Sequence, residues 1–322
     1  MKNVLIFGGL GFIGSNLAES FASLGYNVIV FDNLESHSGG SLKNIHVPNS
    51  NIKVVFHDIL NFDRVIEYVS NQDIIINCAA STSHQYSMRE PLFDLDVNTR
   101  GVLHVLEAIK RYNPSAYFIQ LSTTTQFGKL MNTPANETHY ELPRDIYSAN
   151  KCVSEKYTLV YANAFNLNTA VLRLSNCYGP RACVLDKELT FNNYFIGLAL
   201  NNKPITIYGE GKQLRNLIFI EDIISAIHKL IANPGAFKET YLLVNDEHLS
   251  VKTIAEEIIR ECNSGQLIQI DWPTNSKRVE VGDQVFSNGK IKKKLGWFPA
   301  YSFKEGLKKT IQYYKDNTWY YT

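Results

Sequence analysis

A tyrosine and a lysine stand four positions apart at Tyr147 and Lys151, so both fall on one face of a helix. A free phenol, with a pKa of about 10, is a poor base at neutral pH, but a nearby ammonium group favours its ionised form. Thr123, at the end of an apolar run upstream, offers a hydroxyl. An isolated exposed Tyr and Lys pair is common, so its meaning depends on the motifs around it. With those motifs, Tyr147 can act as a general base and acid, and a hydroxyl such as that of Thr123 can stabilise the reacting oxygen.

A glycine-rich turn, Gly8–Gly14, directly follows the apolar run Val4–Phe7. The glycines at positions 8, 11 and 14 lack the side chains that would keep a pyrophosphate away from the backbone. A helix expected after the turn would supply unpaired N–H groups at its first residues. Such a turn can serve packing alone, but between a strand and a helix it predicts a dinucleotide site.

Asp32 follows the second apolar run, Val28–Phe31, about 20 residues beyond the turn. A carboxylate there binds ribose hydroxyls and repels a 2′-phosphate, so NAD is favoured over NADP as the cofactor. After the third run, Asp58 can accept from the adenine amino group and Ile59 can pack on the ring. An Asp at such a place is also a common turn residue.

These side chains must be positioned by an alternation of short apolar runs and helical segments. The apolar runs are Val4–Phe7, Val28–Phe31, Val54–Phe56, Ile74–Asn77, Phe118–Leu121 and Ala170–Leu174. Segments with helical spacing, such as 16–24, 64–69 and 102–111, separate most of them. The alternation predicts an α/β fold with a doubly wound parallel (Rossmann) sheet that is covered on both faces.

The alternation of apolar runs and helical segments changes after Pro180. An apolar segment at 205–208 and helices near 220–231, 251–261 and 303–314 break the strict alternation. We therefore expect an NAD-binding domain over residues 1–180, which carries Thr123, Tyr147 and Lys151. A smaller C-terminal α/β lobe over residues 181–322 would bind most of the substrate, and later segments can return to the first sheet.

Several motifs occur in one order along nearly the whole chain. They are Gly8–Gly14, Cys78-Ala79-Ala80, Asn98, Tyr147 with Lys151, Arg173 through Arg181, Gly209 through Asn216, and Arg278 before Gly282-Asp283. In this order they resemble the extended short-chain dehydrogenase/reductase family, in its NAD-dependent nucleotide-sugar epimerase and dehydratase branch, which includes UDP-galactose 4-epimerases.

The resemblance implies which residues contact the cofactor and the substrate. Lys151 would grip the nicotinamide ribose and lower the pKa of Tyr147. The NAD contacts are Gly8, Gly11, Phe12, Ile13, Gly14, Asp32, Asn33, Asp58, Ile59, Ala79, Ala80, Asn98, Tyr147 and Lys151. A nucleotide-diphosphate sugar would be contacted by Ser81, Ser83, His84, Thr124, Asn176, Arg215 and Arg278.

The assignment of the substrate residues is based partly on their position in the chain and partly on side-chain chemistry. Ser81 and Ser83 follow the fourth run, where doubly wound sheets place ligands. His84 could be a second acid or base, contact a sugar hydroxyl, or make a structural hydrogen bond. The planar fork of arginine suits a diphosphate, although a lone Arg is usually a surface charge. The spacing from Arg278 to Gly282 is longer than this family usually has.

The residues after Thr123 bear on the reaction. The 4,6-dehydratases of this family usually carry an Asp-Glu pair directly after the catalytic hydroxyl residue. The UDP-glucuronate decarboxylases usually carry a Glu at the place of Thr125. This chain has Thr124-Thr125 at these two positions. Hydroxyls replace carboxylic groups poorly in acid and base catalysis. We therefore expect an epimerase that forms a transient keto-sugar, at C4 by family analogy. A C2 epimerase, an NAD-dependent sugar 4-dehydrogenase or reductase, and an NAD-binding sensor stay open.

Composition excludes several other classes. The chain has 32 Lys and Arg residues and 31 Asp and Glu residues, so its net charge is close to zero and does not indicate a nucleic-acid partner. The 5 cysteines show no metal-ligand spacing, so we expect reduced thiols and no metal. No apolar stretch is long enough for a membrane span, and Met1 leads at once into Val4–Phe7, so we expect a cytoplasmic protein. The family resemblance implies a role in carbohydrate biosynthesis, such as that of lipopolysaccharide or capsule. Family analogy implies a homodimer through the segments 93–109 and 149–164.

Overall fold

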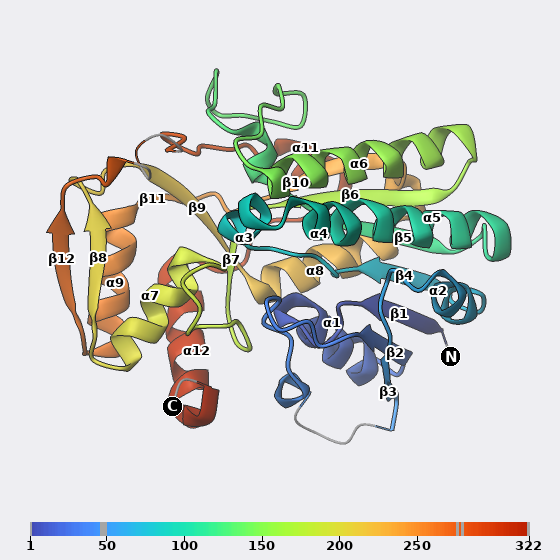
Figure 1. Cartoon of the computed structure of the whole chain (residues 1–322), viewed down its shortest axis with the longest axis horizontal. Helices are drawn as coiled ribbons and strands as arrows, with labels where there is room; N and C mark the ends of the chain where they lie inside the picture. Colours follow the sequence, from blue (N-terminus) through green and yellow to red (C-terminus); the bar gives the residue numbers. More distant parts are fainter. Residues whose placement is uncertain (1, 46–49, 275–276, 278–279, 321–322) are drawn as a thin grey trace.

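The structure, a computed structural model, describes residues 2–45, 50–274, 277 and 280–320. Within these residues seven parallel strands form a central sheet in the order β10-β6-β5-β4-β1-β2-β3. The strands are β1 (Asn3–Phe7), β2 (Asn27–Asp32), β3 (Ile52–Phe56), β4 (Ile74–Asn77), β5 (Tyr117–Thr123), β6 (Asn168–Leu174) and β10 (Glu239–Leu243). The predicted doubly wound α/β fold is confirmed (Figure 1).

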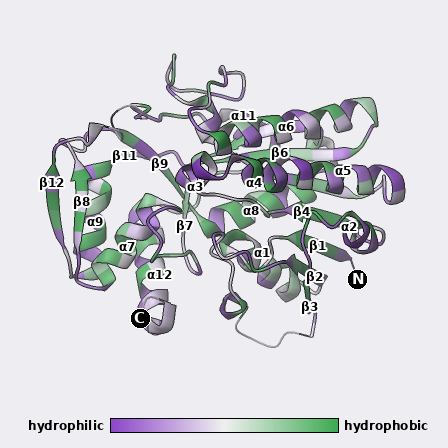
Figure 2. Cartoon of the chain, in the orientation of Figure 1, coloured by the Kyte–Doolittle hydropathy of each residue, from purple (hydrophilic) through white to green (hydrophobic). Residues whose placement is uncertain are grey.

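Apolar side chains bury both faces of this sheet. On β1, Val4 and Ile6 pack with residues of α1 and α8, whereas Leu5 and Phe7 pack with residues of α2 and α5 on the other face. The helices flanking the sheet are α1 (Phe12–Ser23), α2 (Phe62–Val69), α5 (Gly101–Tyr112), α6 (Ile146–Ala164) and α8 (Ile220–Ile231). Helices α5 and α6 alternate hydrophobic with hydrophilic stretches, as expected for helices with one solvent face (Figure 2).

Two short helices, α3 (His84–Arg89) and α4 (Pro91–Leu95), connect β4 to α5. A π-helical turn over Asp96–Arg100 joins α4 to α5. The sheet strand β5 runs on to Thr123 and is followed by a 3₁₀ turn over Thr124–Phe127. These connections lie at the carboxyl ends of β4 and β5, where a ligand cavity is expected in such a sheet.

The remaining elements form the smaller lobe. Within the described residues it holds a three-stranded sheet in the order β11-β9-β7 and a two-stranded sheet of β12 and β8. Its elements are β7 (Asn176–Tyr178), α7 (Phe191–Leu200), β8 (Pro204–Tyr208), β9 (Leu214–Phe219), β11 (His248–Ser250), α9 (Val251–Cys262), β12 (Gln266–Ile270), α11 (Gly289–Leu295) and α12 (Phe303–Asp316). Both β10 and α8 come from beyond residue 180 yet belong to the layers of the large sheet.

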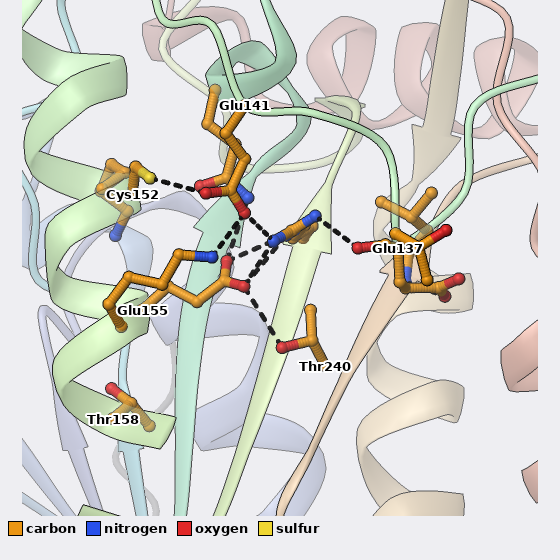
Figure 3. A network of polar contacts seen from close by, with 12 residues as sticks. Glu137, Glu141, Cys152, Glu155, Thr158 and Thr240 are labelled. Carbon is orange, nitrogen blue, oxygen red and sulfur yellow. Dashed lines mark hydrogen bonds and ion pairs between the residues drawn. The ribbon is translucent and has the colours of Figure 1, made fainter. Parts of the chain in front are cut away.

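A buried charged network ties β10 and α6 to β6. Arg173 on β6 is only 2% exposed and donates to Glu155 on α6, with Nε 2.9 Å from Oε2 and Nη2 2.6 Å from Oε1. Thr240 on β10 and Gln126 also donate to Glu155. Figure 3 shows the carboxylates of Glu141 and Glu155 pointing toward the same guanidinium group. The network therefore fixes the position of α6, the helix that carries Tyr147 and Lys151.

Candidate active site

One large cavity lies where the carboxyl ends of the strands meet the smaller lobe. Its lining comes from the glycine turn, from the ends of β2, β4 and β5, from the start of α6, and from β7 and α7. Predicted cofactor, catalytic and substrate residues therefore share one space. The residues of the prediction that line it are Gly8, Gly11, Phe12, Ile13, Gly14, Asp32, Asn33, Asp58, Ile59, Ala79, Ala80, Ser81, His84, Thr123, Thr124, Tyr147 and Asn176.

The glycine turn has no room for a side chain at Gly8 or Gly14. Gly8 has φ at 67°, and a β-carbon on it would lie 2.6 Å from the backbone nitrogen of Ala79. A β-carbon on Gly14 would lie 2.3 Å from the carbonyl oxygen of Gly8. Helix α1 begins directly after Gly11, so the first N–H groups of the helix open onto the cavity. The turn thus fits a pyrophosphate between backbone donors.

Asp32 is fixed at the end of β2. Its carboxylate accepts from the backbone N–H of Leu10 at 3.0 Å and from that of Leu34 at 2.8 Å. Burial raises the pKa of Asp32, whereas these backbone hydrogen bonds lower it. The carboxylate faces the same cavity as the glycine turn, which is the arrangement that binding of an adenosine ribose requires.

The remaining predicted NAD residues surround these two features. Asp58 accepts from the Asn33 side chain at 3.0 Å, which joins the ends of β2 and β3. Asn98 is fully buried in the π-helical turn, and its amide donates to the Ser81 carbonyl at 2.9 Å. The Asn98 side-chain oxygen has no hydrogen-bond partner within the described residues. Asn98 therefore fixes the backbone after β4 and keeps one acceptor free.

The segment beyond the glycine turn is braced by the end of the chain. The Asn44 amide donates to the Leu10 carbonyl at 2.8 Å, and its oxygen accepts from the Tyr320 hydroxyl at 2.6 Å. Tyr320 in the aromatic C-terminal segment therefore supports the backbone of the cofactor site through Asn44.

The structure brings the three predicted catalytic residues together. Tyr147 and Lys151 lie on the first turns of α6, and Tyr147 lines the same cavity as Thr123 at the end of β5. The Lys151 ammonium donates to the Leu121 carbonyl at 2.6 Å. Burial lowers the pKa of Lys151 to about 8, against the raising effect of Asp94.

The Tyr147 phenol is held in its protonated form by the protein itself. Burial raises the pKa of Tyr147, the carboxylates of Asp145 and Asp94 raise it further, and the Thr123 hydroxyl lowers it. The pKa of the buried phenol therefore lies above its ordinary value, which is opposite to the lowering expected from Lys151. Positive charge from a bound nicotinamide would act in the opposite direction, toward the phenolate.

Four of the seven predicted substrate residues line the cavity. Ser81, Thr124 and Asn176 line it, and the Asn176 amide donates to the Asn216 carbonyl at 3.1 Å. His84 also lines it and binds the Asp145 carboxylate through Nδ1 at 2.8 Å. Ser83 does not line the cavity, because its hydroxyl instead accepts from the Tyr86 N–H and begins α3.

Arg215, one of the two predicted arginine contacts, is not part of this lining. Arg215 donates to the Gly282 carbonyl at 2.8 Å and forms an ion pair with Glu280 at 2.8 Å. Its guanidinium is therefore already engaged within the smaller lobe. Arg278 lies outside the described residues.

Three further residues next to the catalytic group were not predicted as site residues, although Thr125 already helped to choose among the reactions. Thr125 and Ser148 form a hydroxyl pair at 2.8 Å, and Thr125 is 3.0 Å from the Thr123 hydroxyl. Asp145 accepts from the Ser148 N–H at 2.7 Å and begins α6. Only Asp145 carries a sequence signal, because Asp is a preferred residue directly before a helix.

Two other searches concern only the described residues. No helix there is long and apolar enough to cross a membrane. No group of three or more His, Cys, Asp or Glu side chains gathers there in a metal-binding arrangement.

The comparisons with known proteins agree with this geometry. Salmonella typhi CDP-paratose 2-epimerase is 31% identical over 343 positions, which cover 95% of this chain and 97% of that protein. The structure of Thermotoga maritima UDP-glucose 4-epimerase with UDP-glucose matches with a TM-score of 0.89 at 27% identity, over 98% of this chain and 99% of that one. Bacillus anthracis dTDP-glucose 4,6-dehydratase in complex with NAD matches with a TM-score of 0.87 at 26% identity, over 100% of this chain and 99% of that one.

Fold, cavity and catalytic group together define the class of extended short-chain dehydrogenases/reductases. Within that class, the sequence pattern described as GDP-mannose 4,6 dehydratase matches residues 5–310, and the chain belongs to this family of NAD-dependent nucleotide-sugar epimerases and dehydratases. The predicted family and its NAD cofactor are thus confirmed, and the protein is an enzyme that modifies nucleotide sugars.

Proposed function

We propose that the enzyme epimerises a nucleotide-diphosphate sugar at one carbinol carbon, C4 in the first instance, through a transient keto-sugar. The observation that carries this proposal is the residue set beside Thr123 in the cavity. Thr124 and Thr125 follow Thr123 in the chain and line the same cavity, and the Thr125 hydroxyl is hydrogen-bonded to the hydroxyls of Thr123 and Ser148. Elimination of water needs an acid and a base at neighbouring carbons, and these hydroxyls supply neither at neutral pH.

Tyr147 and Thr123 would handle the proton of the reacting sugar oxygen. The phenolate form of Tyr147 accepts the hydroxyl proton as the carbonyl forms and returns it when the carbinol is restored. Thr123 stabilises the same oxygen by a hydrogen bond. When bound, NAD supplies the hydride acceptor and donor for the sugar carbon. Lys151, already buried next to this group, would hold the nicotinamide ribose.

The sugar end of the cavity offers polar groups for orientation. Ser81, Thr124, His84 and Asn176 line it and would contact sugar hydroxyls or phosphate oxygens. Arg215 would contact the diphosphate only after its ion pair with Glu280 breaks. Return of hydride to the opposite ring face requires the keto-sugar to turn, so these contacts must be weak enough to exchange.

A C2 epimerase is the second candidate, favoured by one observation. The Salmonella typhi relative at 31% identity is a CDP-paratose 2-epimerase, and it aligns over 95% of this chain. The catalytic group described above serves either carbon, because the same oxygen chemistry applies at C2 and at C4.

The test is product analysis across UDP-, CDP-, dTDP- and GDP-sugars, with NMR for the sugar and absorbance for NADH. An epimer formed without net NADH supports the proposal, and the NMR spectrum identifies the inverted carbon. Stoichiometric NADH would instead identify a dehydrogenase. A 4-keto-6-deoxy product would show a dehydratase and overturn the proposal.

We also propose a homodimer through the segments 93–109 and 149–164, at a surface where α4 and α6 carry exposed apolar side chains. Leu92 on α4 is 75% exposed, and Val160 and Val153 on α6 are 53% and 39% exposed. These two helices lie side by side (Figure 1), and Val153 and Val160 are two helical turns apart on one face. Light scattering after size exclusion should give a dimer for the natural chain and a monomer for Val160→Lys. A monomeric natural chain at micromolar concentration would contradict the proposal.

A further inference from the structure

A histidine paired with a carboxylate lies beside the catalytic tyrosine and has no acid or base role in the proposed epimerisation. His84 is the first residue of α3 and lines the cavity, and its Nδ1 lies 2.8 Å from Oδ2 of Asp145. The His84 ring packs edge-on against the Tyr147 ring, with 4.9 Å between the ring centroids. The imidazole is therefore a neighbour of the group that contacts the reacting sugar oxygen.

Helix α3 packs against the start of α6, so the backbone that carries His84 is held in place. The Ser87 hydroxyl accepts from the Tyr147 backbone N–H at 3.1 Å and donates to the His84 carbonyl at 2.9 Å. At the other end of α3, the Arg89 guanidinium donates two hydrogen bonds to the Glu188 carboxylate, at 3.1 and 2.7 Å. Such a fixed position suits proton transfer, which depends first on geometry.

The ion pair with Asp145 decides which nitrogen of His84 carries the proton. One oxygen of Asp145 accepts from the Ser148 N–H at 2.7 Å, and the other lies against His84. Burial raises the pKa of Asp145, but the hydrogen bonds with His84 and with the Ser148 N–H bring it below its ordinary value. An ionised carboxylate only accepts hydrogen bonds, so it holds the proton of a neutral His84 on Nδ1. Nε2 then keeps its electron pair.

Nε2 of His84 is the ring nitrogen left for a bound molecule. It makes no hydrogen bond within the part of the chain that the structure describes. The His84 side chain is 39% exposed and lines the cavity, whereas Asp145 is not part of that lining. The two residues thus form a neutral base, oriented by a carboxylate, in the same cavity as Tyr147.

A bound keto-sugar would offer this base a proton. Hydrogen on a carbon next to a carbonyl group is acidic, because its loss gives an enolate. With the carbonyl oxygen at Tyr147, that C–H bond breaks, its proton moves to Nε2 of His84, and its electron pair forms the enolate. Burial raises the pKa of Tyr147, so the phenol keeps its proton and donates a hydrogen bond to the enolate oxygen. Return of a proton to the same carbon restores the ketone, and no oxidant or reductant is needed.

We propose that His84 is a further catalytic residue, which enolises a bound nucleotide keto-sugar by taking a proton from a carbon next to the carbonyl group, and that Asp145 positions it. The inference rests on the proposed function only in placing the carbonyl oxygen at Tyr147. Loss of water does not follow, because elimination also needs an acid at the carbon that bears the leaving hydroxyl.

The test follows deuterium uptake from heavy water into nucleotide 4-keto-6-deoxy sugars, because these probes already carry the carbonyl group. The UDP-, CDP-, dTDP- and GDP-linked probes are incubated with the NAD-saturated enzyme, and NMR locates deuterium on the carbons next to C4 above the enzyme-free rate. His84→Gln keeps a polar side chain but removes the base, and should lower the uptake about a hundredfold. His139→Gln is the control, because His139 lies in the loop before α6 and does not line the cavity, so uptake should be unchanged.

Asp145→Asn separates the positioning of His84 from the structure of α6. The Asn oxygen can still accept from the Ser148 N–H, so the start of the helix is kept. The Asn amide then faces His84 as a donor, which moves the His84 proton from Nδ1 to Nε2. Uptake should fall roughly tenfold or more, and nitrogen NMR of labelled histidine should show the change of tautomer, which a merely structural role of Asp145 would not produce.

The outcomes separate this inference from the proposed function. Uptake that depends on His84 supports the inference even if no sugar is epimerised, a result that would refute the proposed function. Absence of uptake from every probe, or equal uptake in the natural enzyme and His84→Gln, would overturn the inference whether or not the enzyme epimerises sugars. A neutral His84 that carries its proton on Nε2 in the natural enzyme would overturn it as well.

Discussion

Loss of the Arg173 charge should expose how much the buried network contributes to stability. Arg173→Met keeps an unbranched side chain of similar reach but removes the guanidinium that binds Glu155 and Glu141. Glu155 is fully buried, and its remaining donors in the described structure are Gln126 at 3.0 Å and Thr240 at 3.2 Å. The variant therefore retains a buried carboxylate with neutral partners only.

The size of the stability loss follows from a general difference: removing one partner of a buried ion pair costs much more free energy than replacing both partners by apolar residues. Removing one partner costs about 3–5 kcal/mol, because the other charge stays desolvated. Domains of ordinary stability unfold with about 5–15 kcal/mol, so the variant should lose a large fraction of the total. Arg173→Met combined with Glu155→Met removes both charges, and should recover most of that loss, to within about 2 kcal/mol of the natural chain.

Urea unfolding followed by circular dichroism measures these differences. Arg64→Met is the matched control, because Arg64 forms an ion pair of similar length, 2.7 Å, with Glu67 on the surface, where both side chains are 49% exposed. Its free energy of unfolding should equal that of the natural chain within error. The reasoning is refuted if Arg173→Met is as stable as Arg64→Met, or if the double variant is no more stable than Arg173→Met alone.

Three other outcomes are expected. Gly14→Ala should destabilise the fold by about 1–3 kcal/mol and weaken NAD binding. In Gly11→Ala the β-carbon would lie at a more tolerable 3.3 Å from the Gly8 carbonyl oxygen, so this variant should lose NAD affinity more than stability. Calorimetric NAD titration beside urea unfolding would show the contrast, and equal stability losses in the two variants would contradict it. Asp32→Ser should weaken NAD binding about tenfold or more and improve the relative affinity for NADP, and an unchanged cofactor ratio would be inconsistent with a ribose-binding carboxylate. Burial raises the pKa of Asp222 to about 6, against the lowering effect of the backbone N–H of Ala300, so the folded protein keeps a proton that the unfolded chain loses. Stability should therefore fall as the pH rises from about 4 to about 6, and unfolding of Asp222→Asn across this range should lack that fall; a slope equal to that of the natural chain would rule it out.

The central sheet was predictable because its early strands are short continuous apolar runs. Such runs signal strands buried on both faces, and each of the six proposed runs coincides with a strand of the large sheet. Strand β10 was not predicted, because Glu239–Leu243 carries no stronger signal than its neighbours. Its place beside β6 is a pairing between distant parts of the chain, which periodicity does not reveal.

Most of the predicted cofactor residues, with Thr123 and Tyr147, lie around one cavity, and local spacing suffices to predict that placement. A turn between a strand and a helix, or two residues on one helical face, is defined within a few positions of the chain. The environment of Arg215 is different, because Glu280 and Gly282 approach it from a distant segment. The same holds for Tyr147, whose protonation depends on Asp94 from another helix.

The insertion of β10 at the edge of the sheet bears on how the chain folds as it leaves the ribosome. When Leu174 has been made, β6 can pair with β5, but its other side stays an open edge until Glu239–Leu243 emerges. An open edge strand is a template for pairing with other chains. The nascent first half must therefore keep its β6 edge out of contact with other chains while the elements from β7 to α8 are synthesised. A fragment that stops near residue 180 keeps that edge permanently and is a poor choice for producing the NAD-binding half alone.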